Sequence, residues 1–239
     1  MPLHIGIMAC SAEGAAECYR IICAEAEKPL GPHGNPPISL HMPSLSDYVR
    51  HLEAGNLEGV GALMLETAER LASAGAEFLI CPDNTIHQAL PTLTRELPLP
   101  FLHIAETVAD EAHQRGFRHL GLTGTRWLVE SGVYPDALGR RGIALTLPTP
   151  DERGEMNRII MDELVYGRFT GEAEQAFQRI MKRMGDAGCD AVVLGCTEIP
   201  LLINEKNALL PVLDSTRLLA RAALRHAVEE RLPVLNGAR

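Results

Sequence analysis

Two segments far apart in the chain carry the same pattern without a gap. Residues 74–85 are AGAEFLICPDNT and residues 187–198 are AGCDAVVLGCTE. In each, Ala-Gly ends a helical pattern, where glycine suits a left-handed cap. An acidic residue, a buried strand and a polar turn follow. The alignment predicts two similar halves in which Asp83 corresponds to Cys196, but it is short and does not by itself define a function.

Short apolar runs alternate with segments of helical periodicity along the chain. Runs typical of strands buried on both faces are residues 3–8, 38–42, 78–81, 101–104, 119–124, 144–148, 191–195 and 209–214. Helical patterns cover residues 12–28, 45–73, 104–115, 127–140, 154–166, 172–186 and 215–230. This alternation predicts βαβ units, and therefore an α/β fold with parallel sheets.

Composition excludes several classes of protein. With 46% hydrophobic residues, the chain should form packed globular domains. The net charge is −9 and no run of lysines or arginines occurs, which argues against a nucleic-acid partner. No apolar stretch is long enough to span a membrane, and the N-terminus resembles a first strand more than a signal peptide. We therefore expect a cytoplasmic protein without a membrane partner.

The six cysteines do not suggest a metal site or a disulfide scaffold. They are Cys10, Cys18, Cys23, Cys81, Cys189 and Cys196. None forms a Cys-x-x-Cys pair, and their spacing fits neither structural zinc nor paired disulfides. We expect free thiols and no bound metal.

The repeat also predicts where a ligand binds. Open α/β sheets bind ligands beyond the carboxyl ends of their strands, and Asp83 and Cys196 both follow such ends. If the two halves face each other about a pseudo-twofold axis, both side chains point into one cleft. One group could then remove a proton from one face of a tetrahedral carbon while the other returns a proton to the opposite face.

Seven motifs occur in the order seen in the aspartate/glutamate racemase family. They are GIMACSAEG, DNTIH, PFLHIAE, GLTGTRW, NRIIMDELVYG, LGCTEIPLL and PVLDST. The chain resembles this family over nearly its whole length. The most specific motifs are Asn84-Thr85-x-His87 and Gly195-Cys196-Thr197-Glu198, taken together with the Leu-x-Gly-Thr turn between them.

The resemblance implies two parallel-sheet α/β domains related by a pseudo-twofold axis, with the active site in the cleft between them. We expect residues 1–98 plus 213–239 to form the domain carrying Asp83, and residues 99–212 the domain carrying Cys196. The resemblance also implies a cofactor-independent amino-acid racemase, which needs neither pyridoxal phosphate nor metal. Such an isomerase acts on small carboxylates such as aspartate or glutamate. A homodimer is the expected assembly.

The sequence departs from the family at three places. Asp83 stands where most relatives carry a first cysteine, so symmetric two-thiol chemistry is not expected. The opening loop, residues 7–11, lacks the Gly-Gly-Met of many relatives, and a lysine found near Tyr166 in some relatives with acidic substrates is absent. These departures bear on the substrate side chain, which the sequence does not identify.

The two proposed catalytic groups have alternative roles. Cys196 precedes an expected helix, whose backbone N–H groups would lower its pKa and favour a thiolate base; otherwise it is a buried structural thiol. Asp83 could transfer a proton, alone or sharing one with Cys196. It could instead cap the helix that begins near Thr85.

Polar residues in the turns after the strands could hold the substrate. Backbone amides and the side chains of Ser11, Asn84, Thr85, Thr123, Thr125 and Thr197 are suited to binding a carboxylate. Such binding would also stabilise the enediolate that forms when the α-proton leaves. Glu198 could accept the substrate ammonium, position Cys196, or be a first-turn charge that the helix dipole favours.

Four residues are weaker candidates. His87 could orient a carboxylate or face solvent, and Cys10 is a rival thiol because it also follows a strand. Arg50 and Arg126 could neutralise a second substrate carboxylate.

Two other functions compete with racemisation. A single-thiol decarboxylase of the same superfamily would also keep its cysteine in the second half and would protonate an intermediate from one side. A non-catalytic carboxylate sensor is the third class, and the retention of Cys196 in Gly-Cys-Thr-Glu argues against it.

Overall fold

The computed structural model describes residues 1–229, which form two four-stranded parallel sheets with the same strand order. The first sheet runs β2 (Ile38–His41), β1 (Ile5–Met8), β3 (Phe78–Ile80), β4 (Phe101–Leu102). The second runs β6 (Ala144–Thr146), β5 (His119–Thr123), β7 (Ala191–Leu194), β8 (Val212–Asp214). The predicted α/β fold with parallel sheets is confirmed, and the halves built on these sheets are called the first and second half below.

Helices connect the strands in both halves. The α-helices are α1 (Ala12–Leu30), α2 (Leu45–Glu53), α3 (Leu57–Ser73), α4 (Ile104–Gln114), α5 (Arg126–Val129), α6 (Val133–Gly139), α7 (Pro150–Asp162), α8 (Gly171–Asp186), α9 (Ile199–Leu202) and α10 (Ser215–Glu229). Two 3-10 helices are η1 (Thr85–Thr92) and η2 (Leu164–Tyr166). Within the described residues, none of the helices has the length and apolar character needed to cross a membrane.

The repeated Ala-Gly segments adopt the same conformation. Gly75 and Gly188 follow α3 and α8 with φ angles of +91° and +93°, a region that glycine adopts without steric cost. In both places the next residue donates its N–H to the carbonyl five residues earlier, at 3.0 Å. The predicted left-handed caps are therefore confirmed, and each cap feeds the chain into a buried central strand.

The helix predicted over residues 45–73 is divided in two. Gly55 adopts a φ of +64° just after α2, which breaks the helical path. The side chain of Asn56 then accepts the Gly59 N–H at 2.8 Å and begins α3. Periodicity alone missed this break because both helices turn their apolar faces to the same core.

Two other helix boundaries differ from the sequence prediction. Residues 130–132 separate α5 from α6, so the pattern over 127–140 forms two short helices. Helix α7 begins at Pro150, before the predicted start at residue 154. Thr149 and Glu152 form a capping box there, in which each side chain accepts a backbone N–H of the other residue.

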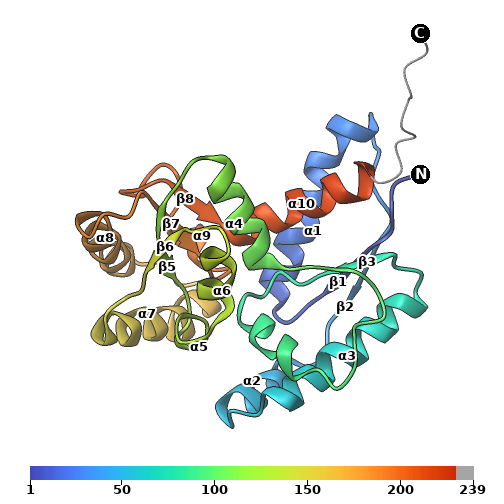
Figure 1. Cartoon of the computed structure of the whole chain (residues 1–239), viewed down its shortest axis with the longest axis horizontal. Helices are drawn as coiled ribbons and strands as arrows, with labels where there is room; N and C mark the ends of the chain where they lie inside the picture. The colour runs from blue at the N-terminus through green and yellow to red at the C-terminus, as the bar shows by residue number, and fades with distance from the viewer. Residues whose placement is uncertain (230–239) are drawn as a thin grey trace.

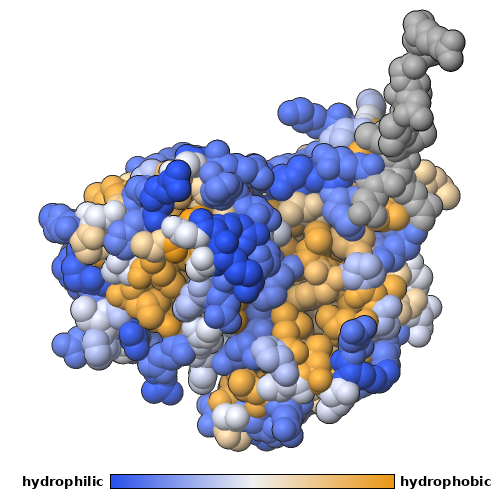
Figure 2. All heavy atoms as spheres, viewed as in Figure 1, coloured by the Kyte–Doolittle hydropathy of each residue, from blue (hydrophilic) through white to orange (hydrophobic). Residues whose placement is uncertain are grey.

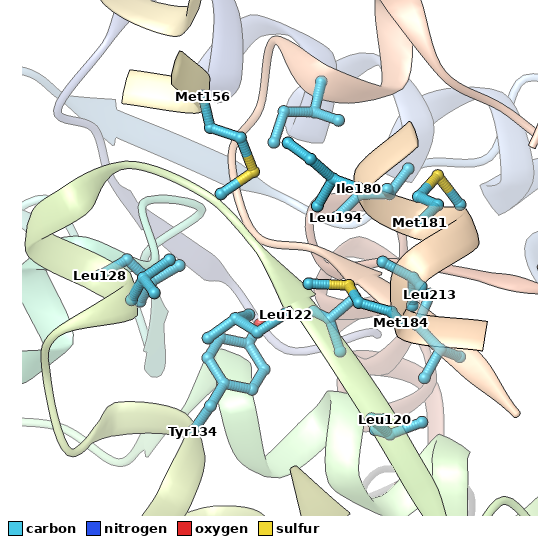
Figure 3. Close-up of a cluster of buried hydrophobic side chains, with 14 of the residues drawn as sticks. Leu120, Leu122, Leu128, Tyr134, Met156, Ile180, Met181, Met184, Leu194 and Leu213 are labelled. Carbon is cyan, nitrogen blue, oxygen red and sulfur yellow. The ribbon is translucent and has the colours of Figure 1, made fainter. Parts of the chain in front are cut away.

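Apolar side chains form separate cores around the two sheets. In the first half, one cluster packs between the sheet, α1 and α10, and another lies on the opposite face with α3. In the second half, one continuous cluster joins the sheet to α4, α6, α7 and α8. Figure 3 shows part of it, with Leu120, Leu122 and Leu194 of the strands close to Met156, Ile180 and Met184 of the helices.

The chain passes between the halves twice. After β4 it enters α4, which packs against the second half, and after β8 it enters α10, which packs against α1 and α4 (Figure 1). By strand pairing, β4 belongs to the first sheet and β8 to the second, so the sheets change a few residues after the predicted boundaries at 98 and 213. The division into folding domains stays a prediction. Residues 230–239 of the predicted first domain lie outside the described residues, and so does residue 230, the last one of the helix predicted over 215–230.

The two halves differ in the surface they present beside α10. Figure 2 shows hydrophobic residues gathered on the first half below α10, and a smaller hydrophobic patch among hydrophilic residues on the second half, at the left.

Candidate active site

A cavity of about 110 Å³ lies where the carboxyl ends of the two sheets meet. Its polar wall comes from the loops that follow the central strands: Ser11 after β1, Asp83 after β3, Thr125 after β5 and Cys196 after β7. The structure thus brings Asp83 and Cys196 into one cavity, as the repeat predicted. A wider hollow of about 830 Å³ lies between α1 and α10, but Glu25 and Arg221 in its lining form an ion pair and it contains no thiol.

Asp83 is held by donors from its own loop and from α2. Its Oδ1 accepts the backbone N–H of Ile86 at 2.8 Å and the hydroxyl of Tyr48 at 3.0 Å. The first of these is the helix-capping contact considered from sequence. Burial raises the pKa of Asp83 above its ordinary value, and the negative charge of Glu198 adds to this, although the two hydrogen bonds oppose it. Asp83 is therefore both a cap and a carboxylate of increased basicity.

Cys196 is paired with a carboxylate two residues along the chain. Its Sγ donates to Oε2 of Glu198 at 3.0 Å, and the hydroxyl of Thr197 donates to the same oxygen at 2.8 Å. Burial raises the pKa of Cys196 well above its ordinary value, and the charge of Glu198 together with this hydrogen bond raises it further.

The expectation that a helix start lowers the pKa of Cys196 is therefore wrong. The following helix, α9, has a single turn and begins only at Ile199, so its backbone N–H groups offer little stabilisation to a thiolate. Burial has the largest effect on the pKa of Cys196 and raises it, and the nearby negative charge of Glu198 acts in the same direction. In this structure Cys196 is a thiol that can donate a proton.

Threonines from the two halves meet across the cavity. The hydroxyls of Thr85 and Thr125 lie 3.2 Å apart. Thr125 also caps α5, and Ser11 caps α1 by accepting the Gly14 N–H at 3.3 Å. Thr197 and Glu198, which were also predicted from sequence, line the same cavity. Hydroxyl groups that can both donate and accept suit this wall to a substrate carboxylate.

Asn84 lines the cavity, but its side chain also links the halves. Its Nδ2 donates to Ser215 Oγ at 2.9 Å, and its Oδ1 accepts the hydroxyl of Tyr134 at 2.7 Å. Ser215 in turn donates to the Leu194 carbonyl at 2.8 Å. This buried network joins the end of β7 to the Asp83 loop, so Asn84 positions the loop.

Thr123 is not part of the cavity lining. It is fully buried, and its hydroxyl donates to the Val193 carbonyl of the neighbouring strand at 2.8 Å. The turn prediction placed it in the site, but it is the last residue of β5, where the alternation of the strand turns its side chain inward.

His87 faces neither solvent nor the cavity. It is buried, with Nδ1 2.8 Å from the Asp83 carbonyl, and its Nε2 accepts the Ile104 N–H at 3.3 Å. Burial keeps the pKa of His87 well below its ordinary value, so the ring is neutral. It fixes the Asp83 loop against the start of α4.

The remaining sequence candidates lie outside the cavity. Cys10 is buried against Cys81, with the two Sγ atoms 3.9 Å apart, and is not a rival thiol in the lining. Arg50 forms an ion pair with Asp47 at 3.1 Å, and the exposed Arg126 does not line the cavity. Neither arginine therefore faces the site.

Sequence reasoning missed two aromatic lining residues. Tyr48 projects from α2 onto Asp83, and Trp127 of α5 reaches toward the apolar cluster of the first half. Tyr48 lies on the same face of α2 as Leu45 and Leu52, and this periodicity was the available signal. Within residues 1–229, no group of three or more His, Cys, Asp or Glu side chains is placed to hold a metal ion.

Comparison with known proteins identifies relatives of this arrangement. The family model for Asp/Glu/Hydantoin racemase matches residues 5–223. The crystal structure of a candidate Asp/Glu racemase from Yersinia pestis superposes with a TM-score of 0.87 at 31% identity, covering 95% of this chain and 99% of that one. An aspartate racemase homologue from Pyrococcus horikoshii gives a TM-score of 0.81 at 28% identity, with the same coverage.

A curated relative matches over a shorter length. A glutamate racemase from Thermus thermophilus is 32% identical over 167 residues, which is 67% of this chain and 59% of that protein. The chain thus spans about six tenths of the length of the curated glutamate racemases that it matches.

Proposed function

Because the chain belongs to the Asp/Glu/Hydantoin racemase family, we propose that it is a cofactor-independent amino-acid racemase, an isomerase that inverts the α-carbon of a small amino acid. One observation carries the proposal: Asp83 and Cys196 follow corresponding strands of two similar halves and line the same cavity. Two proton-exchanging groups on opposite sides of one ligand are what inversion requires.

The proposed reaction moves one proton off and one proton onto the α-carbon. The Asp83 carboxylate removes the α-proton on its face, and the electron pair of the C–H bond delocalises into the substrate carboxylate as an enediolate. The Cys196 thiol then gives its proton to the opposite face. Asp83 is left protonated and Cys196 as a thiolate, which is the form that converts the other enantiomer.

The environments of the two groups support this division. Burial and Glu198 raise the pKa of Asp83, which makes it a better base than an exposed aspartate. The same charge raises the pKa of Cys196 and keeps the proton on sulfur until the carbanion forms. Glu198 acts on the reaction by positioning the thiol through the 3.0 Å contact.

Hydroxyl groups are proposed to hold the substrate carboxylate. Ser11, Thr85, Thr125 and Thr197 line the polar wall, and hydrogen bonds to the carboxylate would strengthen as charge develops in the enediolate. Asn84 and Thr123 support these loops from behind. We further propose that the protein is a cytoplasmic homodimer. Size-exclusion chromatography with light scattering measures the mass in solution and would test the dimer.

Proton NMR in D2O with a panel of L- and D-amino acids tests the proposal. Loss of the α-proton signal from both enantiomers of one substrate, with inversion, is the expected result. Release of CO2, with deuterium entering one face only, would instead indicate the single-thiol decarboxylase. If purified, folded protein exchanges no amino acid in the panel, the racemase proposal is wrong.

A further inference from the structure

We propose that the substrate of this racemase carries a neutral, apolar side chain. The inference rests on the proposed function and names the substrate class of the same cavity. It departs from the acidic amino acids that the resemblance implies, and it follows from the residues that form the second wall of the cavity.

The cavity has two chemically different walls. The loops after the strands supply the polar wall described above. The other wall comes from helices and is apolar: it is formed by Val49 and Leu52 of α2, Trp127 of α5, Ile160 and Met161 of α7, and Val165 of η2. A substrate whose carboxylate lies on the polar wall therefore directs its side chain toward aliphatic and aromatic groups.

No cation faces the apolar wall. Among the described residues that line the cavity there is no lysine, arginine or histidine, whereas Asp83 and Glu198 both contribute carboxylates. Arg50 on α2 is paired with Asp47 at 3.1 Å, and Arg158 on α7 with Glu163 at 2.7 Å. These two arginines therefore have partners outside the cavity, and Arg126 of α5 is exposed and does not line it.

A second substrate carboxylate would be poorly accommodated there. The carboxylate would lose its hydration and gain no counter-ion, which is costly for a buried charge. It would also add to the negative charge already in the site. An apolar side chain gains from the same transfer, because it exchanges water for Leu, Ile, Val, Met and Trp contacts. The lining therefore favours substrates with a neutral side chain over substrates with a second carboxylate.

Methionine, glutamine and glutamate have side chains of similar length, so comparing them separates the effect of side-chain charge from that of size. For wild-type protein, we expect kcat/KM for α-proton exchange in D2O to fall in the order methionine, glutamine, glutamate. The value for methionine should exceed that for glutamate by roughly 100-fold or more, because glutamate would bury an unpaired charge. If glutamate exchanges as fast as methionine or faster, or aspartate as fast as leucine or faster, the inference is overturned while the racemase proposal stays intact.

Binding can be measured without catalysis. The chain contains one tryptophan, Trp127, and it lines the apolar wall, so its fluorescence reports ligands in the cavity. We expect methionine and leucine to change the emission at lower concentrations than glutamate and aspartate. If this order holds but no α-proton exchanges, the substrate-class inference stands and the racemase proposal fails; the reverse order of binding overturns the inference.

A charge added to the apolar wall should change the preference. Met161 is a half-buried lining residue whose unbranched stem resembles that of lysine. Met161→Lys should raise the glutamate-to-methionine ratio of kcat/KM at least about 10-fold, since the new ammonium neutralises the side-chain carboxylate. Met42→Lys is the matched control, because Met42 is exposed and outside the lining, and its ratio should equal that of wild type. An unchanged ratio in folded Met161→Lys contradicts the inference; should that variant not fold, the wild-type panel decides alone.

Discussion

The Cys196 thiol donates to the Glu198 carboxylate, with Sγ 3.0 Å from Oε2, in a cavity that also contains Asp83. Burial raises the pKa of both proposed catalytic groups, and the negative charge of Glu198 raises each of them further. Together these effects make Asp83 a stronger base and hold the proton on Cys196. The pseudo-symmetric halves thus present unlike groups, a carboxylate on one side and a thiol on the other.

Removing the thiol should stop the reaction. We expect Cys196→Ala to abolish inversion, because no group remains to protonate its face of the α-carbon. Cys189→Ala is the control: Cys189 is buried and precedes β7, at the opposite end of the strand, and its variant should keep wild-type exchange. Inversion by Cys196→Ala at the wild-type rate would make the thiol structural.

Asp83→Asn separates proton transfer from capping. Asparagine caps helices about as well as aspartate and can still accept from Ile86 and Tyr48, so the free energy of unfolding should change by less than about 1 kcal/mol. Racemisation should fall by about 10²–10⁴-fold, the usual contribution of a positioned base. Urea denaturation and D2O exchange of both enantiomers measure the two effects.

Wild-type exchange of both enantiomers by Asp83→Asn would show that Asp83 only caps and orients. Asp83→Cys is an informative companion, since it restores the thiol pair of the family. An increase in racemisation there would indicate that the carboxylate has made the natural reaction slower or one-sided.

Tyr48→Phe should shift the acidic limb of the pH profile. The Tyr48 hydroxyl donates to Oδ1 at 3.0 Å and lowers the pKa of Asp83, opposing the effect of burial. Its removal raises that pKa further, so the carboxylate forms only at higher pH. The lower limb of kcat/KM for inversion should move to higher pH in Tyr48→Phe, and an unmoved limb would mean that the hydrogen bond does not tune Asp83.

Glu198→Gln should shift the alkaline limb in the opposite direction. The charge of Glu198 and its hydrogen bond with Cys196 raise the pKa of the thiol. Without them the pKa falls, and the thiol needed as proton donor is lost at lower pH. The rate of alkylation of Cys196 by iodoacetamide as a function of pH gives a second measurement. A thiol that titrates as in wild type would rule out this role for Glu198.

Asn84→Ala should cost stability as well as activity. It leaves the buried Tyr134 hydroxyl and Ser215 Oγ without their amide partner, and buried groups left unsatisfied cost about 1–3 kcal/mol each. The midpoint of urea unfolding should fall accordingly. Tyr134→Phe, which removes one of these bonds, should cost less, and equal stability of Asn84→Ala and wild type would contradict the network.

The local sequence determined the elements and much of the site. Apolar runs, glycine caps and the repeated Ala-Gly pattern predict the strands, their parallel pairing and the correspondence of Asp83 with Cys196, because each depends on backbone conformation and periodicity within short segments. The tertiary structure decided what these side chains contact. Burial, together with Tyr48 and Glu198, sets the protonation of the catalytic pair, and the buried Asn84 network joins the two halves. The helices that lack a facing cation set the chemistry of the second wall. These properties depend on burial and on contacts made in the folded chain, so no local pattern could specify how strongly burial raises the pKa of Cys196 or place Thr123 inside the core.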